Sequence, residues 1–336
     1  MELYGGDSAR QYADFGNDWV GAESPVFRDW ALAIAEDAEV LALVDTLPEL
    51  KRQPNLVLAA GRWHGAEPGP YDGLRRVLLD QWPAVRETVL TRATQTNEVA
   101  RCATLLPVLA GLPGPLALIE VGASAGLCLH PDRYSYRWSD GSALDPAGGP
   151  SRVVLTCEVS GNPPLPVAMP EVVWRAGIDL NPLDVGDDDA MAWLENLVWP
   201  GQDERRARLR AAIDVAREDP PVLVQGDLVD TLPALVDQAP PEATLVVFHS
   251  AVIFYLPPGR RADFARMMGK LVGARRVHWI SNEGPEVVPG ISLSAPPDGC
   301  FALALDGVPV ALTHGHGRSL HWLGAGEPSS DATRSR

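Results

Sequence analysis

The chain has 336 residues, of which 46% are hydrophobic and 21% charged, proportions typical of a globular protein rather than a disordered one. Its net charge of −16 excludes general binding to nucleic acid or to an anionic membrane, because both need a basic face. No apolar run approaches the roughly 18 residues that span a bilayer, and the first residues do not resemble a signal peptide. The four cysteines are scattered without C-x-x-C spacing, so we expect a cytoplasmic protein with neither disulfides nor a metal site.

The first 110 residues predict a helical N-terminal domain, because their apolar residues recur at helical spacing. One such face runs from Phe27 through Trp30 and Ile34 to Leu41. Near the end of this region, the polar segment 96–98 (Thr-Asn-Glu) is typical of a helix start, and it could instead face a ligand site.

Residues 111–324 predict a Rossmann-like α/β domain. Short apolar runs alternate there with helical patterns, which favours crossover connections and a mainly parallel sheet. The expected strands lie at 116–121, 172–180, 222–227, 244–250 and 275–284. The sheet is then predicted to end in an antiparallel hairpin, because an Asp-Gly pair separates two strand-like runs after residue 300.

Two segments depart from this alternation. Residues 131–171 are too many for a single crossover helix, and their alternating runs predict an inserted β-hairpin that covers or shapes a site. The polar tail 325–336 is expected to be disordered.

The stretch IEVGASAG, which spans the end of the first expected strand and the residues after it, is the main candidate for a functional site. It contains Glu120, Gly122, Ala123, Ser124 and Gly126. As a G-x-S-x-G motif it could be the nucleophile elbow of a serine hydrolase, with Ser124 as the nucleophile. It could equally be a glycine-rich turn that lets a nucleotide-like cofactor approach the backbone, followed by a helix whose first N–H groups bind an anionic group.

The ends of the next two strands favour the cofactor interpretation. Asp179, followed by Leu180, ends the second expected strand, where a carboxylate can accept hydrogen bonds from a ribose diol. Asp227 ends the third, where it can accept from an adenine amine. Because adjacent strand ends of an open parallel sheet border one crevice, we expect these groups to meet around an adenosyl-shaped cleft. A dinucleotide site is less favoured, because the G-x-G-x-x-G spacing is missing.

At this level the sequence resembles a bacterial family, the domain-of-unknown-function family 2332. The resemblance covers most of the chain and is carried by long blocks such as IEVGASAGLCLHPDRYSYRW, VVWRAGIDLNPLDV and LVVFHSAVIFYLP. The fold of that family in turn looks like that of class I S-adenosylmethionine-dependent methyltransferases. The resemblance implies that Glu120 and the glycine turn hold the methionine end of the cofactor, Asp179 the ribose and Asp227 the adenine.

The ends of the fourth and fifth strands are the expected acceptor side. His249 is the candidate general base, because histidine titrates near neutral pH, and Tyr255 is placed beside it as a catalytic residue. Ser250, Asn282 and Glu283 are candidate substrate contacts.

The sequence therefore predicts a methyltransferase that uses S-adenosylmethionine and a small-molecule acceptor. Two alternatives stay open: a serine hydrolase that uses Ser124, and a ligand-binding protein of methyltransferase-like fold without catalysis. The acceptor and the oligomeric state do not follow from the sequence.

Overall fold

The computed structural model describes residues 7–21, 23–293, 296–297 and 299–324. The expected disordered tail, 325–336, lies outside the described residues. The chain divides into two compact units, and each contains two stretches of sequence. The helical unit takes residues up to 96 together with 187–210, and the α/β unit takes 97–186 together with the residues from 211 onward. The division thus differs from the expected boundary at 110, because residues 97–110 group with the sheet.

Several helices of the helical unit begin directly after an N-cap residue, whose side chain accepts a hydrogen bond from a backbone N–H of the first turn. Ser24 accepts a hydrogen bond from the N–H of Phe27 and precedes Pro25, a residue suited to the first helical turn. Asp37 caps the next helix, so the apolar face predicted from Phe27 to Leu41 is divided between two helices. The elements are α1 (Ser8–Asp14), η1 (Phe15–Val20), α2 (Pro25–Glu36), α3 (Ala38–Val44), η2 (Glu49–Lys51), α4 (Pro54–Trp63), α5 (Tyr71–Asp80), α6 (Trp82–Thr91), α8 (Asp188–Asn196) and the first part of α9 (Asp203–Glu218).

Helix α8 belongs to the helical unit because its side chains bond to the N-terminal helices. Trp193 Nε1 donates to the carbonyl of Ala93 at 2.9 Å, and Asn196 Nδ2 donates to the carbonyl of Ala59 at 2.7 Å. The Arg62 guanidinium donates to the carbonyl of Asn196 at 2.8 Å. Residues between the second and third core strands therefore complete the fold of the first 96.

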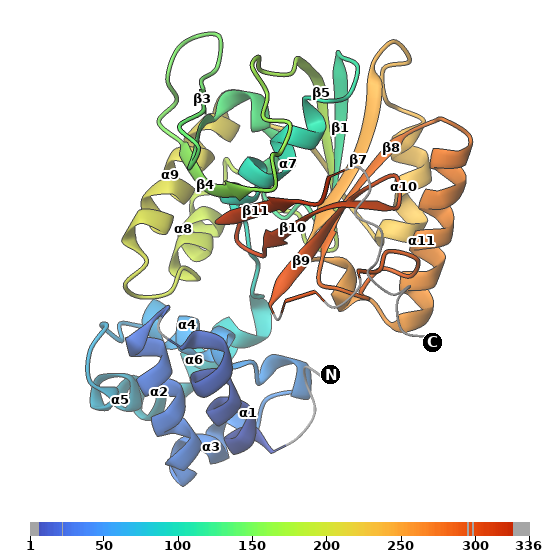
Figure 1. Cartoon of the computed structure of the whole chain (residues 1–336). Helices are drawn as coiled ribbons and strands as arrows, with labels where there is room; N and C mark the ends of the chain where they lie inside the picture. Colours follow the sequence, from blue (N-terminus) through green and yellow to red (C-terminus); the bar gives the residue numbers. More distant parts are fainter. Residues whose placement is uncertain (1–6, 22, 294–295, 298, 325–336) are drawn as a thin grey trace, which may run out of the picture. The chain divides into compact units, whose positions relative to one another are not determined.

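The α/β unit contains an 11-stranded sheet in the order β3-β2-β4-β11-β10-β9-β8-β7-β1-β5-β6 (Figure 1). Five adjacent strands form its parallel core, with the order reversing between β1 and β7, which is the arrangement of a doubly wound fold. The core strands are β1 (Leu116–Val121), β5 (Val172–Asp179), β6 (Val222–Gln225), β7 (Thr244–Ser250) and β8 (His278–Glu283). The predicted Rossmann-like parallel sheet is confirmed.

The rest of the sheet is built by the C-terminal strands and by the inserted segment. The strands β9 (Cys300–Leu305), β10 (Val308–His314) and β11 (Ser319–Trp322) form an antiparallel meander, which confirms the terminal hairpin and adds a third strand. In the insertion, β2 (Ser135–Trp138) and the short β3 (Ala143–Leu144) form an antiparallel pair. The second alternating run of the sequence pairs with β2 in parallel and does not form a hairpin with it. A further strand, β4 (Val154–Ser160), is parallel to both β2 and β11, so the insertion extends the sheet.

Strand alternation assigns side chains to the two faces of the parallel core. Ile119, Val121 and Val247 pack with residues of the helices α10 (Leu228–Val236) and α11 (Pro258–Gly273) in one buried cluster. Glu120, between Ile119 and Val121, therefore projects from the opposite face. Two further elements, η3 (Val99–Arg101) and α7 (Cys102–Leu109), precede β1. Within the described residues, no helix has the length and apolar content needed to cross a bilayer.

Candidate functional site

The glycine turn after β1 reverses the chain instead of starting a helix. Gly122, Ser124 and Gly126 have φ angles of 75°, 51° and 69°, so three of its five residues are left-handed. Only the short 3₁₀ turns η4 (Leu127–Leu129) and η5 (Pro131–Arg133) follow before β2. The expected helix with free N–H groups at its start is therefore wrong, because repeated left-handed residues and Pro131 interrupt a helical path.

The space beside the glycines is occupied by other side chains of the protein. A Cβ added to Gly122 would lie 1.9 Å from Cγ2 of Val252, and one added to Gly126 would lie 2.7 Å from Cγ of Pro221. Ala123 packs on β5, where a Cβ on Gly177 would lie 2.5 Å from its methyl group. The small residues of the turn thus allow close packing against β5, β6 and the segment after β7.

Asp179, at the end of β5, holds the glycine turn because its side chain accepts a hydrogen bond from a backbone N–H of the turn. Its Oδ2 accepts from the N–H of Ser124 at 2.8 Å, and its Oδ1 accepts from the N–H of Asn181 at 2.8 Å. The pairing of Val121 with Ile178 places the turn and Asp179 at the same edge of the sheet. Leu180, the next residue, is 71% exposed. Each carboxylate oxygen has a second lone pair, so Asp179 can still accept hydrogen bonds from a ligand.

Glu120 is the most unusual residue of this edge. Its side chain is buried, and its Oε2 has no hydrogen-bond partner among the described residues. Burial raises the pKa of Glu120 well above its usual value, and the nearby Cys128 and Asp179 add to the rise while Arg101 opposes it. A buried carboxyl oxygen without a partner is costly, and acids with perturbed pKa values concentrate at functional sites.

Two other polar groups are buried in segments next to Glu120. One belongs to the glycine turn, and the other belongs to the segment that Cys128 contacts. The hydroxyl of Ser124 and the side-chain N–H₂ of Asn97 have no hydrogen-bond partners among the described residues. Cys128 is close to Glu120, and its Sγ donates to the carbonyl of Glu98 at 3.6 Å, which brings the segment with Asn97 towards β1. The polar segment at residues 97–98 was noted in the sequence as a possible ligand contact, whereas Cys128 carried no recognisable signal.

Arg101 and the ends of β7 and β8 border the same face of the sheet as Glu120. Arg101 is buried and donates to the carbonyls of Gly315 at 2.8 Å and Ser250 at 2.9 Å. Asn282 donates from Nδ2 to Ser250 Oγ at 3.0 Å and accepts from Thr313 at 2.7 Å. Ser250 and Asn282 therefore lie together, as the sequence suggested.

His249 and Glu283 lie on the opposite face, so the expected acceptor side is divided. Trp279 Nε1 donates to His249 Nε2 at 3.1 Å, which places the ring proton on Nδ1, and Nδ1 donates to Glu283 Oε1 at 2.8 Å. His249 is fully buried and has neither nitrogen free for a substrate. The role of His249 as a general base and of Glu283 as a substrate contact must be corrected, because both serve the packing under α11.

Asp227 and Tyr255 are two further residues that the sequence predicts for the site. Asp227 lies at the tip of β6, but its Oδ1 caps α10 by accepting from the N–H of Val229 at 2.9 Å, and it pairs with Arg260. These contacts give Asp227 a structural role at α10, and its expected role toward adenine stays a prediction. Tyr255, in η6 (Ile253–Tyr255), is 62% exposed, and its ring lies tilted against that of Phe254. Its catalytic role stays a prediction.

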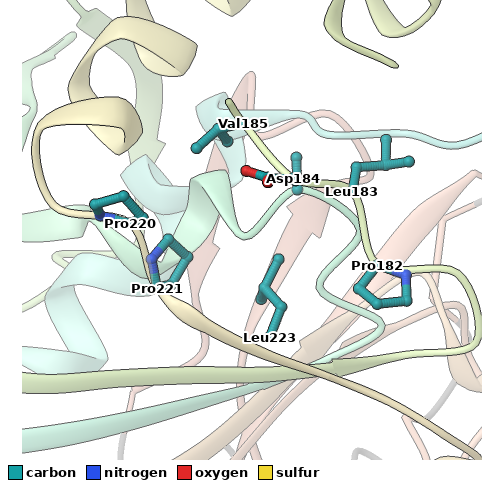
Figure 2. Close-up of a pocket in the computed structure, with 8 residues that line it drawn as sticks. Pro182, Leu183, Asp184, Val185, Pro220, Pro221 and Leu223 are labelled. Carbon is teal, nitrogen blue, oxygen red and sulfur yellow. The ribbon is translucent and has the colours of Figure 1, made fainter. Parts of the chain in front are cut away.

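A small cavity lies behind the glycine turn, with a volume of about 260 Å³ (Figure 2). Asp184 is the one carboxylate among its lining residues, and the others are apolar: Ala125, Pro182, Leu183, Val185, Pro220, Pro221 and Leu223. The volume falls below the roughly 300–1,000 Å³ of typical ligand pockets. Since neither Glu120 nor Asp179 lines it, we do not assign the adenosyl group to this cavity.

The geometry also bears on the hydrolase and metal interpretations. Ser124 has the left-handed φ of a strained turn, as a nucleophile elbow requires, but no base is hydrogen-bonded to its hydroxyl among the described residues. Among those residues, no three His, Cys, Asp or Glu side chains are grouped so that they could hold a metal ion.

The model of a bacterial protein family matches residues 9–322, which is nearly the whole chain. That family is described as uncharacterized proteins conserved in bacteria (DUF2332), and the chain belongs to it. A search of the curated proteins finds no match.

Proposed function

We propose that this member of the family is an S-adenosylmethionine-dependent methyltransferase acting on a small molecule. The observation that carries the proposal is the buried carboxyl group of Glu120, with its unpartnered Oε2, at the reversal of strand order between β1 and β7. In open α/β sheets, ligands bind in the crevice at this point. A ligand with an ammonium group would supply the partner that Oε2 of Glu120 lacks.

The polar groups around Glu120 fit the amino-acid end of such a cofactor. Asn97 offers a buried N–H₂ donor and Ser124 a buried hydroxyl, both suited to a carboxylate. Asp179 holds the turn in place and can accept from ribose hydroxyls with its remaining lone pairs. Leu180 offers an exposed apolar side chain next to it for the base. The adenine contact is not assigned to Asp227.

When bound, S-adenosylmethionine supplies a methyl group on a sulfonium centre. The protein's part is to orient the acceptor and to exclude water. Ser250 and Asn282, on the same face as Glu120, are the residues we assign to the acceptor side. The network of Asn282 with Ser250 and Thr313 fixes the orientation of these side chains, and neither Ser250 nor Asn282 carries a charge.

Calorimetric titration with S-adenosylhomocysteine tests the proposal. We expect micromolar binding that Glu120→Gln and Asp179→Ala each weaken at least about tenfold, an effect equal to about 1.4 kcal/mol. Asp184→Asn is the matched control, because this exposed carboxylate lies at the cavity behind the turn and not at Glu120. A wild-type protein that binds neither S-adenosylhomocysteine nor S-adenosylmethionine would remove the proposal.

Two further measurements separate the alternatives. Cofactor binding without release of S-adenosylhomocysteine across amine, hydroxyl and carboxylate acceptors would favour a non-catalytic ligand-binding protein. The left-handed Ser124 with its unpartnered hydroxyl keeps the hydrolase as a second candidate. Labelling of wild type, but not of Ser124→Ala, by a fluorophosphonate probe would favour it.

A further inference from the structure

The segment between β7 and α11, residues 251–257, packs directly on the glycine turn, and we call it the gate turn. Cβ and both methyl groups of Val252 lie within 3.0 Å of where a side chain on Gly122 would begin. The glycine position expected to let a ligand approach the backbone is thus covered by an isopropyl group from another strand end. A ligand that approaches Gly122 from this side must displace Val252.

Glu283 holds the gate turn from beneath. Its Oε1 accepts from the N–H of Val252 at 2.8 Å and of Ile253 at 3.0 Å, in addition to the bond from His249. Hydrogen bonds to a carboxylate are stronger than those between neutral groups, and this one is fully buried. His249 and Glu283 have no role in the proposed site. Their hydrogen bonds therefore serve to fix the position of Val252.

The backbone of the gate turn is held in an unfavourable conformation. Ala251 has a φ of 56°, a left-handed value that residues with a Cβ rarely adopt. Its N–H donates to the carbonyl of Asn282 at 3.1 Å, and at the other end of the turn Arg261 donates to the carbonyl of Leu256 at 2.8 Å. Backbone strain at residues other than glycine concentrates at active sites, ligand clamps and switch regions. The gate turn is thus held in place by hydrogen bonds while its backbone is strained at Ala251.

We propose that the gate turn is a closing element of the cofactor crevice, in which Val252 seals the glycine turn and Glu283 acts as the latch. This inference rests on the proposed function, since it assigns regulation to the same crevice. The cofactor then binds only those molecules in which the gate turn is open. The apparent dissociation constant equals the intrinsic one divided by the open fraction, so a small open fraction weakens binding.

The test compares Val252→Ala and Glu283→Gln with Val272→Ala, a matched control on α11 that packs on the same apolar cluster. We expect Val252→Ala to tighten binding of S-adenosylhomocysteine by about three- to tenfold. Glu283→Gln should increase hydrogen exchange at the amides of residues 252 and 253 at least about tenfold, with the amides of β1 as internal reference. Val272→Ala should change neither quantity.

The possible results separate this inference from the proposed function. If wild type binds S-adenosylhomocysteine and Val252→Ala binds it equally or more weakly, the gate is refuted and the methyltransferase proposal stands. If exchange at residues 252 and 253 is unchanged in Glu283→Gln, the latch is refuted. If no variant binds the ligand, the methyltransferase proposal fails and the gate fails with it.

Discussion

The folded protein should lose stability in mild acid, and replacing His130 by glutamine should abolish a large part of that loss. His130 is fully buried, and neither ring nitrogen has a hydrogen-bond partner among the described residues. Burial, followed by the nearby Arg175, lowers the pKa of His130 from 6.5 to about 3. The unfolded chain therefore takes up a proton near pH 6.5 that the folded chain refuses until pH falls to about 3.

The magnitude follows from this difference. Stability should fall as pH is lowered through 6.5, by about 2 kcal/mol between pH 7 and pH 5, and the full difference of about 3.5 pH units corresponds to about 4.8 kcal/mol. The assay is urea denaturation of wild type, His130→Gln and His321→Gln at both pH values, where His321 is an exposed control. Equal losses between pH 7 and pH 5 in wild type and His130→Gln would refute the reasoning.

Three further predictions concern the carboxylates. Glu120→Gln should raise the free energy of unfolding by about 1 kcal/mol at neutral pH while weakening S-adenosylhomocysteine binding, because a costly buried acid is exchanged for a neutral amide; a less stable variant would contradict this. Affinity for S-adenosylhomocysteine should fall as pH is lowered through the raised pKa of Glu120, since protonation removes the charge that attracts the ammonium. A flat affinity over the whole pH range in which the protein stays folded would count against that contact. Asp227→Ala should cost about 1 kcal/mol through the lost cap of α10, measured by denaturation, with no change in S-adenosylhomocysteine affinity, whereas weakened binding would restore its expected role.

The sequence predicted most of the sheet and only part of the site. All five core strands were identified, because buried parallel strands are short continuous apolar runs, and β1 and β7 match the expected bounds. The conformation after Gly122 could not be predicted, because a run of small residues is equally compatible with a helix start and with repeated left-handed turns. The second stretch of the helical unit, residues 187–210, was missed because α8 has the same helical pattern as a crossover helix.

The functional assignments differ in how far they depended on tertiary contacts. Asp179 and Glu120 could be placed at one edge because the ends of adjacent parallel strands coincide. His249 and Glu283 occupy strand ends too. Alternation along β7 and β8 decides from which face of the sheet their side chains project, and the prediction considered only the ends of the strands. Val252 gave no signal, because its contact with Gly122 joins segments 130 positions apart by numbering.

The helical unit cannot be excised by a single cut, since it is assembled from two separated lengths of polypeptide. Expressing residues 97–336 alone would strip α8 of its hydrogen-bonding partners at Ala59 and Ala93 and would bare the indole of Trp193 to solvent. Such a fragment is expected to aggregate. Any dissection of this protein must therefore carry residues 187–210 with the amino-terminal helices, joined by a designed linker, or leave the polypeptide whole.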